Sequence, residues 1–422
     1  MFTCCILSLM FVKSLQRFEK IALILLLFLL PTQLAFHFWP PWAFVFGIRV
    51  DFLSPSIYAT DILVAILFVI SLLVDKKTLS KSIARNKYYI LALLLFVITN
   101  IVFSVSPFVS IYKWIKVIEF TFLAYYFSKQ KTLGMASIIK ILLLTSSFFS
   151  LIGILQFFSG GTLGGILYYL GERTFNMSTP GIALVAINGA EHLRAYSTFS
   201  HPNSLAGFLG IVIILVLTNG HLKDSKTKIP ALVISLVCFV VAFSLSAYIG
   251  ISTALLFWLI SKYKKLFKYM AYIFLSLSIF LSLLMPMVSS SILKVVPGVS
   301  QNLSQRLDLA AISGKLISHN FFFGGGLGTF VIGATRVHGF TNTWLLQPVH
   351  NISLLIFTEI GLIGLLAFCF LLYKVFLKSP LLFLFIIVTG LTDHYWLTLQ
   401  QNTLLLSILY GISFRISTWR KS

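Results

Sequence analysis

Apolar runs, each close to the length of a membrane span, recur along almost the whole chain and alternate with short polar segments. About 20 apolar residues are needed for a helix to cross a bilayer, so this pattern predicts membrane-spanning helices. Twelve segments fit, at residues 21–38, 57–74, 88–105, 110–127, 137–158, 203–219, 230–246, 248–261, 269–288, 350–373, 380–395 and 396–414. The expected fold is an all-α integral membrane protein that forms a single polytopic domain over residues 1–422.

Composition agrees with this class. The 422 residues are 58% hydrophobic and only 10% charged, with a mean hydropathy of +0.98, which excludes an ordinary soluble domain. A net charge of +21 would suggest nucleic acid as the partner of a soluble protein. Here the lysines flank apolar runs, so we interpret the charge as a topology signal and expect no nucleic-acid partner. The first run has no small-residue cleavage site, which favours a retained signal anchor.

The distribution of basic residues sets the orientation. With both termini in the cytoplasm, 23 of the 32 Lys and Arg fall in inner segments and seven in outer ones. This bias is the one that the positive-inside rule requires. It also favours two helices at 230–246 and 248–261 over one long helix, because the Lys-rich segment 262–268 must then lie inside.

Two long segments remain outside, at residues 159–202 and 289–349. Loops of this length without structure of their own are uncommon and are usually functional. Within the second, residues 303–317 have the apolar spacing of a helix that could lie along the membrane surface. We expect the second segment to carry part of an active site.

Arginine and histidine are distributed differently from lysine, which lies mostly in the predicted inner segments. Only two of 23 lysines are outside, but seven of eight histidines lie outside or at the outer edge, together with five of nine arginines: Arg49, Arg173, Arg194, Arg306 and Arg336. Arginine binds phosphate through a planar fork and stays charged. The surplus of outer cations therefore predicts a site for an anion.

Two helix starts carry polar motifs on the outer side. In the first, Arg194 leads to His201, Pro202 and Asn203, and proline is tolerated in a first helical turn. An outward helix N-terminus with a nearby arginine can bind an anion, although plain helix capping accounts for part of this motif. We expect Arg194 to be catalytic and His201 and Asn203 to contact the substrate.

In the second motif, His350 and Asn351 precede the tenth apolar run. A neutral imidazole there can take a proton from a sugar hydroxyl, with a structural interfacial histidine as the alternative. Arg306, near the start of the helix expected at 303–317, either projects toward the membrane plane or pairs with Asp308. The residues alone leave both interpretations open, with His350 and Arg306 as candidate catalytic residues and Asn351 as a candidate substrate contact.

The segment 323–330, Phe-Gly-Gly-Gly-Leu-Gly-Thr-Phe, permits close backbone approach and positive φ. It predicts either a tight turn that re-enters the membrane surface or a nest of amides around Gly326 that binds phosphate. It is not a P-loop, because no Gly-Lys-Ser/Thr follows.

No metal, disulfide or cofactor is expected. The four cysteines map to the cytoplasmic tail or to helices, and no CxxC or HExxH pattern occurs. A transporter is a rival interpretation, because a set of ionisable residues at or near membrane depth could form a proton path: Asp61, Lys113, Lys116, Glu119, Glu359 and Asp393.

The order of the motifs carries a resemblance. The chain resembles the O-antigen ligase and O-antigen polymerase superfamily in the order of five segments. They are Arg-Ala-Tyr-Ser-Thr-Phe-Ser-His-Pro-Asn at 194–203, the Arg-led helix, the glycine segment, His-Asn-Ile-Ser-Leu-Leu at 350–355 and Glu-Ile-Gly-Leu-Ile-Gly at 359–364. The resemblance implies about twelve transmembrane helices in the C-type architecture of membrane glycosyltransferases. It also implies transfer of a saccharide from undecaprenyl diphosphate to an acceptor hydroxyl on the outer leaflet of the bacterial inner membrane, without a metal or nucleotide sugar.

By the same resemblance, His350 matches the essential loop histidine, and Arg194 and Arg306 match arginines that bind the lipid diphosphate. Single displacement would invert the anomeric centre. Many members carry a Ser-Arg pair at an outer turn that reads Ser-Leu-Ser-Ala-Tyr at 244–248 here. Either another residue such as Arg336 or Arg173 supplies that charge, or this member is divergent or inactive. The partners implied are the lipid-linked donor, a glycolipid or saccharide acceptor and membrane lipids. A polymerase that extends the lipid-linked chain, or a transporter or flippase for a lipid-linked saccharide, is the alternative.

Overall fold

The computed structural model describes residues 2–218, 227–260, 263–295, 301–339 and 343–419. This part of the chain is mainly helical, as predicted. Its helices are α1 (Phe2–Leu29), α2 (Ala59–Arg85), α3 (Lys87–Val102), α4 (Pro107–Lys129), α5 (Met135–Ser159), α6 (Pro202–Thr218), α7 (Lys228–Val241), α8 (Leu245–Ile260), α9 (Lys264–Val295), α10 (Gln301–His319), α11 (Phe330–His338), α12 (Ile352–Phe376), α13 (Pro380–Gly390), α14 (Tyr395–Thr398) and α15 (Gln400–Trp419).

Length and composition identify membrane helices only in part. Among the described residues, three helical stretches are long and apolar enough to cross a membrane, namely Met135–Ser159, Tyr272–Ser289 and Ile352–Phe376. Shorter apolar stretches lie in α2, α3, α6, α7, α8 and α13. These helices support a membrane protein, and twelve crossings stay a prediction.

Several predicted boundaries are confirmed and others are wrong. The pair α7 and α8 forms two helices, and α10 covers the helix expected at 303–317. The segment 21–38 is wrong at its end, because α1 stops at Leu29, two residues before Pro31, and proline disfavours helical backbone in the residue before it. Residues 380–395 form α13 and then a turn. The expected outer segment includes residues 296–300 and 340–342, which lie outside the described residues.

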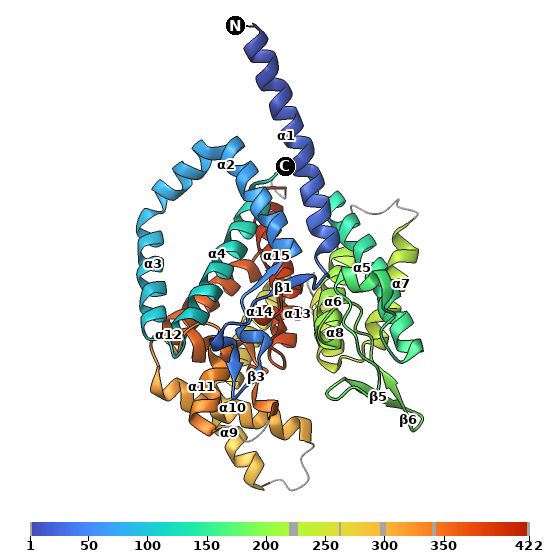
Figure 1. Ribbon diagram of the computed structural model, residues 1–422, viewed down its shortest axis with the longest axis vertical. Coiled ribbons are helices and arrows are strands. Elements are labelled where there is room, and N and C mark those ends of the chain that lie inside the picture. Colours follow the sequence, from blue (N-terminus) through green and yellow to red (C-terminus); the bar gives the residue numbers. More distant parts are fainter. Residues whose placement is uncertain (1, 219–226, 261–262, 296–300, 340–342, 420–422) are drawn as a thin grey trace.

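Three short antiparallel ribbons, which the sequence did not predict, complete the fold. The strands are β1 (Ala35–His37) with β4 (Ser56–Tyr58), β2 (Phe44–Val45) with β3 (Ile48–Arg49), and β5 (Leu184–Ile187) with β6 (Ala190–Leu193). The first two ribbons connect α1 to α2, and the third lies in the expected outer segment 159–202. Figure 1 shows the termini toward one end of the molecule and α9, α10, β5 and β6 toward the other.

Helix α6 lies at the centre of the bundle, and its residues from Pro202 to Val216 are all buried. Two glycines allow this. A Cβ on Gly207 would lie 2.6 Å from the Tyr395 ring, and one on Gly210 would lie 2.2 Å from the Phe385 ring. Small residues let helices approach closely, so α6 packs directly against α13 and α14.

Helix α12 is broken, and the glycine segment lies against the break. Gly361 interrupts α12 with φ 68°, and a Cβ there would lie 2.3 Å from the carbonyl oxygen of Phe322. A Cβ on Gly324 would lie 2.4 Å from the backbone of Glu359. The sequence Glu-Ile-Gly-Leu-Ile-Gly therefore packs against the glycine segment. The turn interpretation of residues 323–330 agrees with this geometry.

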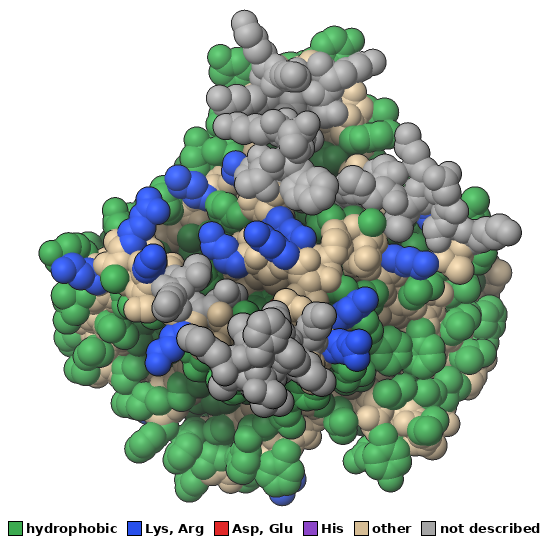
Figure 2. Space-filling view, turned by 90° about the horizontal axis from the view of Figure 1, so that it is seen from above, with side chains coloured by type: hydrophobic (Ala, Val, Ile, Leu, Met, Phe, Trp, Pro, Cys, Tyr) green, Lys and Arg blue, Asp and Glu red, His purple; other side chains and the backbone are tan. Residues whose placement is uncertain are grey.

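Lysine and arginine side chains gather at the end of the molecule from which α1 projects, and hydrophobic side chains surround them (Figure 2). This arrangement is the one expected for the cytoplasmic face of a membrane protein. The outer motifs lie away from it, because Arg194 follows β6 directly and Arg306 is on α10. Lys223, Lys226, Lys262, Arg420 and Lys421 lie outside the described residues.

Candidate functional site

A chain of hydrogen bonds joins the segment before α6 to the turn between α13 and α14. Nη2 of Arg194 donates to Oδ1 of Asn203 over 2.7 Å, and Nδ2 of Asn203 donates to Oδ2 of Asp393 over 2.9 Å. Asn203 and Asp393 are both buried. Tertiary packing therefore brings together a cation and a carboxylate that are 199 residues apart in the sequence.

His350 and His394 meet beside this chain. Their ring centroids are 5.1 Å apart, and the rings are edge to face at 62°. The backbone N–H of His394 donates to Oδ1 of Asp393 over 2.8 Å, and its Nδ1 lies 2.7 Å from Oγ1 of Thr398. Phe52, between β3 and β4, packs its ring edge to face against His394 at 5.5 Å. His394 is thereby held on three sides.

The imidazole of His350 is uncharged in this site. Its Nδ1 is buried and has no hydrogen-bond partner among the described residues. Burial, with His394 and Arg306 nearby, lowers the pKa of His350 to about 3, against the opposing effect of Asp393. The imidazole is therefore neutral near pH 7, and the same shift makes it a weaker base than a free histidine.

Arg194 and Arg306 supply positive charge to the same region. Arg194 is half-buried and donates from Nε to the carbonyl oxygen of Ala242 over 2.8 Å. Arg306 is half-buried, and its Nη1 lies 3.4 Å from the carbonyl oxygen of Thr392. Both charges act on His201, although burial is the main cause that lowers its pKa to about 4. The predicted residues Arg194, Arg306, His201 and His350 thus lie in one site.

The turn that lacks the Ser-Arg pair is contacted by Arg194 itself, through Ala242 at the end of α7. Arg173 and Arg336 are the two arginines expected to replace the missing Ser-Arg charge. Arg173 lies nearer to the site, because its Nη1 donates over 3.0 Å to the carbonyl oxygen of Ser200, next to His201. Arg336 is exposed on α11 and donates to Val105, between α3 and α4. The geometry thus favours Arg173, and it gives no support to Arg336 as a substrate ligand.

Asn351 and Gly326 have structural partners in place of a ligand. The Asn351 side chain is buried, accepts from the backbone N–H of Leu354 and donates to Ser282 and Leu391. The Gly326 amide donates to the carbonyl oxygen of Glu359 over 3.0 Å. The geometry therefore does not support the prediction that these two residues contact substrate, since the groups available for it are already bonded within the fold.

The amides of the glycine segment bind a carboxylate of the chain. Gly328 donates to one oxygen of Glu359 over 2.8 Å, and Phe330 donates to the other over 3.2 Å. Each of these donors would otherwise be available to a phosphate. In the described structure these amides bind the Glu359 carboxylate, and phosphate binding by the glycine segment stays a prediction.

The ionisable residues assigned to a transporter divide into separate groups. Lys116 pairs with Asp61 at 2.5 Å and with Glu119 at 3.0 Å. Asp393 belongs to the histidine site. Lys113 interacts electrostatically with both Lys116 and Glu359, so these residues form one cluster that does not include Asp393. The transporter interpretation stays an alternative.

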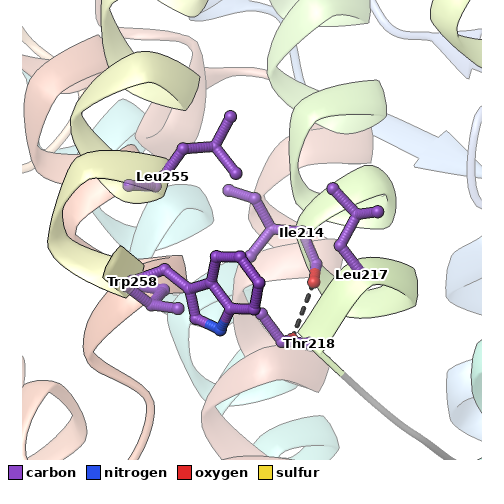
Figure 3. A pocket seen from close by; sticks show the side chains of 7 residues that line it. Ile214, Leu217, Thr218, Leu255 and Trp258 are labelled. Carbon is purple, nitrogen blue, oxygen red and sulfur yellow. Dashed lines mark hydrogen bonds between the residues drawn. The ribbon is translucent and has the colours of Figure 1, made fainter. Parts of the chain in front are cut away.

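The cavities of the described structure do not add chemistry. One, of about 100 Å³, lies between α6 and α8 and is lined by apolar side chains and Thr218, whose hydroxyl donates to the carbonyl oxygen of Ile214 (Figure 3). No titratable group lines it. No group of three His, Cys, Asp or Glu that could hold a metal occurs among the described residues.

Sequence reasoning missed His394 and gave Asp393 another role. The available signal was an Asp-His pair at the outer end of the eleventh apolar run. Two ionisable residues at the end of a membrane span indicate a functional site, as at the helix-start motifs of His201 and His350. Their proximity to His350 comes from the packing of α13 and α14 and could not be inferred from spacing.

Residues 230–369 match the family model described as O-antigen ligase. The matched stretch holds Arg306, the glycine segment and His350, whereas Arg194, Asp393 and His394 lie outside it. No curated protein matches the chain.

Proposed function

Because residues 230–369 match the O-antigen ligase family model, we propose that the protein is a membrane glycosyltransferase that transfers a saccharide from undecaprenyl diphosphate to an acceptor hydroxyl. The observation that carries this proposal is a neutral His350, whose buried Nδ1 has no hydrogen-bond partner among the described residues, near Arg306 and His201. Arg194 in turn acts on His201. A base next to fixed cations is the arrangement that glycosyl transfer from a diphosphate needs.

The arginines would bind the leaving group. Undecaprenyl diphosphate concentrates negative charge as it departs, and preorganised donors that face developing charge are usually the largest catalytic contribution. Arg194 is anchored through Ala242 and Asn203, so its guanidinium is fixed before the donor binds. Arg306 is more open and would complete the clamp from α10.

His350 would act as the general base. The acceptor oxygen attacks the anomeric carbon, the bond from that carbon to the diphosphate oxygen breaks, and the hydroxyl proton passes to His350. A single displacement of this kind inverts the anomeric centre. Helix α10, which carries Arg306, and β6, which leads to Arg194, lie away from the end at which α1 projects (Figure 1). We therefore propose that transfer takes place on the extracytoplasmic face of the bacterial inner membrane.

The test is transfer in proteoliposomes that contain the purified protein, an undecaprenyl-diphosphate-linked saccharide and an acceptor glycolipid. His350→Ala should lower the rate by roughly 100-fold or more, the usual contribution of a general base. His192→Ala is the matched control, because His192 is an outer histidine that stacks on Phe157. An unchanged rate in His350→Ala would refute the assignment.

We favour a ligase over a polymerase because of the family description. The two activities differ in the acceptor, since a polymerase extends the lipid-linked chain and a ligase transfers it to a different molecule. Mass spectrometry of envelope glycolipids from cells with and without the gene separates them. Lipid-linked chains of normal length that accumulate untransferred support a ligase, and loss of chain extension would identify a polymerase.

A further inference from the structure

We infer that Asn203 is an amide spacer that keeps Asp393 from pairing directly with Arg194, so that the guanidinium remains available to the donor diphosphate. Asn203 is then a positioning residue and not a substrate ligand. The inference rests on the proposed function and assigns a specific task within it.

The two ends of the Asn203 amide determine this role. Its carbonyl oxygen accepts from Arg194 over 2.7 Å, and its NH2 group donates to Asp393 over 2.9 Å. An amide has one accepting and one donating end, so it can connect a cation to a carboxylate only in this order. With 9% of its surface exposed, the side chain has both ends committed within the fold.

Asp393 is satisfied without the arginine. One carboxylate oxygen accepts from the Asn203 amide and the other from the backbone N–H of His394. Its negative charge can therefore fix the turn that holds His394 while it stays one side chain away from Arg194. A carboxylate in the place of Asn203 would instead lie within hydrogen-bond distance of the guanidinium.

Arg194 keeps capacity for a ligand. Within the described part of the chain its hydrogen bonds use Nε, to Ala242, and Nη2, to Asn203. Arginine has five N–H donors, so the Nη1 end is left for a phosphate oxygen. A direct ion pair in this half-buried position would attract strongly, because the local dielectric is low, and a diphosphate would have to compete with it.

Plain helix capping is the competing explanation, and it predicts the opposite effect of an acidic substitution. Aspartate caps a helix start as well as asparagine does and is favoured by the helix dipole, whereas alanine is a poor cap. If Asn203 only supports α6, aspartate should be tolerated and alanine should be harmful. If Asn203 is a spacer, aspartate should impair donor binding more than alanine does.

The decisive variant exchanges the two side chains, Asn203→Asp with Asp393→Asn. Composition, net charge and the amide-to-carboxylate contact are preserved, but the carboxylate now faces Arg194. We would measure the affinity for undecaprenyl diphosphate in nanodiscs and the KM and kcat for transfer in proteoliposomes. The expected result is a dissociation constant and a KM for the donor that both rise about tenfold or more, the scale of one lost charge-assisted contact.

Asn203→Ala is measured alongside, and its affinity should fall between wild type and the exchanged variant. Thermal melting of each variant shows whether it is folded, and the order of affinities between Asn203→Ala and Asn203→Asp decides the question if the double variant does not fold. Wild-type affinity in the exchanged variant, or weaker binding by alanine than by aspartate, would overturn the spacer role. Failure of the proposed function gives a different result, in which the wild-type protein itself transfers no saccharide.

Discussion

The rings of His350 and His394 lie edge to face with centroids 5.1 Å apart. In the sequence, 43 residues that include α12 and α13 separate the two histidines. His394 is itself fixed by Asp393, Thr398 and Phe52. The ring of His394 is thus supported by its contacts, whereas Nδ1 of His350 is unsupported, since it has no hydrogen-bond partner among the described residues. His350, the unsupported member, is free to exchange a proton with a substrate.

Replacing His394 by Phe should shift the pH dependence of transfer. After burial, His394 is the strongest influence that lowers the pKa of His350, so its removal should raise that pKa from about 3 toward the ordinary value. His350 must be neutral to accept a proton, so the rate should begin to fall at a higher pH in the variant than in the wild type.

The measurement is kcat/KM for transfer between pH 4 and pH 8. Arg306, His201 and Asp393 also act on His350 and are retained in the variant. A proportional loss of rate at all pH values, with no displaced acid limb, would assign His394 to packing alone.

Acid should destabilise the fold by protonating His350 and His201. Burial is the first cause that lowers the pKa of His350 to about 3 and of His201 to about 4, below the ordinary value of 6.5. The unfolded chain therefore binds protons first, and stability is lost as pH falls from about 6.5 toward these lower values. The melting temperature in detergent should fall from pH 7 to pH 5, and it should fall less in His201→Gln. An equal fall in both proteins would contradict this origin.

Arg306 should not be replaceable by lysine. Arginine binds a diphosphate through a two-pronged fork, whereas lysine offers one compact charge. Arg306→Lys should raise the donor KM about tenfold and Arg306→Ala by more, consistent with a net value of roughly 1.5–3 kcal/mol for a charged hydrogen bond. Wild-type KM in the lysine variant would show that only net charge matters.

Alanine variants of Arg173 and Arg336 should differ in donor affinity, because only Arg173 lies where it could replace the missing Ser-Arg pair. Arg173 is bonded to Ser200, next to His201, whereas Arg336 is bonded to Val105. Arg173→Ala should therefore weaken donor affinity several-fold, on the scale of an exposed charge contact of about 1 kcal/mol. Arg336→Ala should change it little. The reverse order would restore Arg336 as the ligand and would refute our reading of the α7–α8 turn.

The break in α12 should tolerate no side chain. Gly361 has φ 68°, and a Cβ would lie 2.3 Å from the carbonyl oxygen of Phe322, so Gly361→Ala combines backbone strain with overlap. Gly339→Ala is the matched control, because Gly339 has φ 73° with nothing within 4 Å of its Cβ position. Strain alone costs about 1–3 kcal/mol, so Gly361→Ala should lower the melting temperature clearly more than the control does. Equal losses would mean that the overlap is relieved at no cost.

The sequence by itself determined the helical class, the separation of α7 from α8, a helix at 303–317, which lies within α10, and the family resemblance. Each of these depends on local information, since apolar periodicity and short motifs are readable along one stretch of chain. The same information pointed to Arg194 and Arg306, because an arginine in a predicted outer segment departs from the positive-inside rule, and to His350 through the His-Asn motif at a predicted helix start.

Only the tertiary structure decided what each polar group contacts. Asn203, Asn351 and Gly326 have the residue types of ligand-binding groups, yet the fold directs the first to Arg194 and Asp393, the second into the start of α12 and the third to Glu359. A buried polar group must find a partner, and that partner can come from any part of the chain. For this reason the sequence located the outer site, while packing of α6, α12 and α13 selected the residues that remain free to act on a substrate.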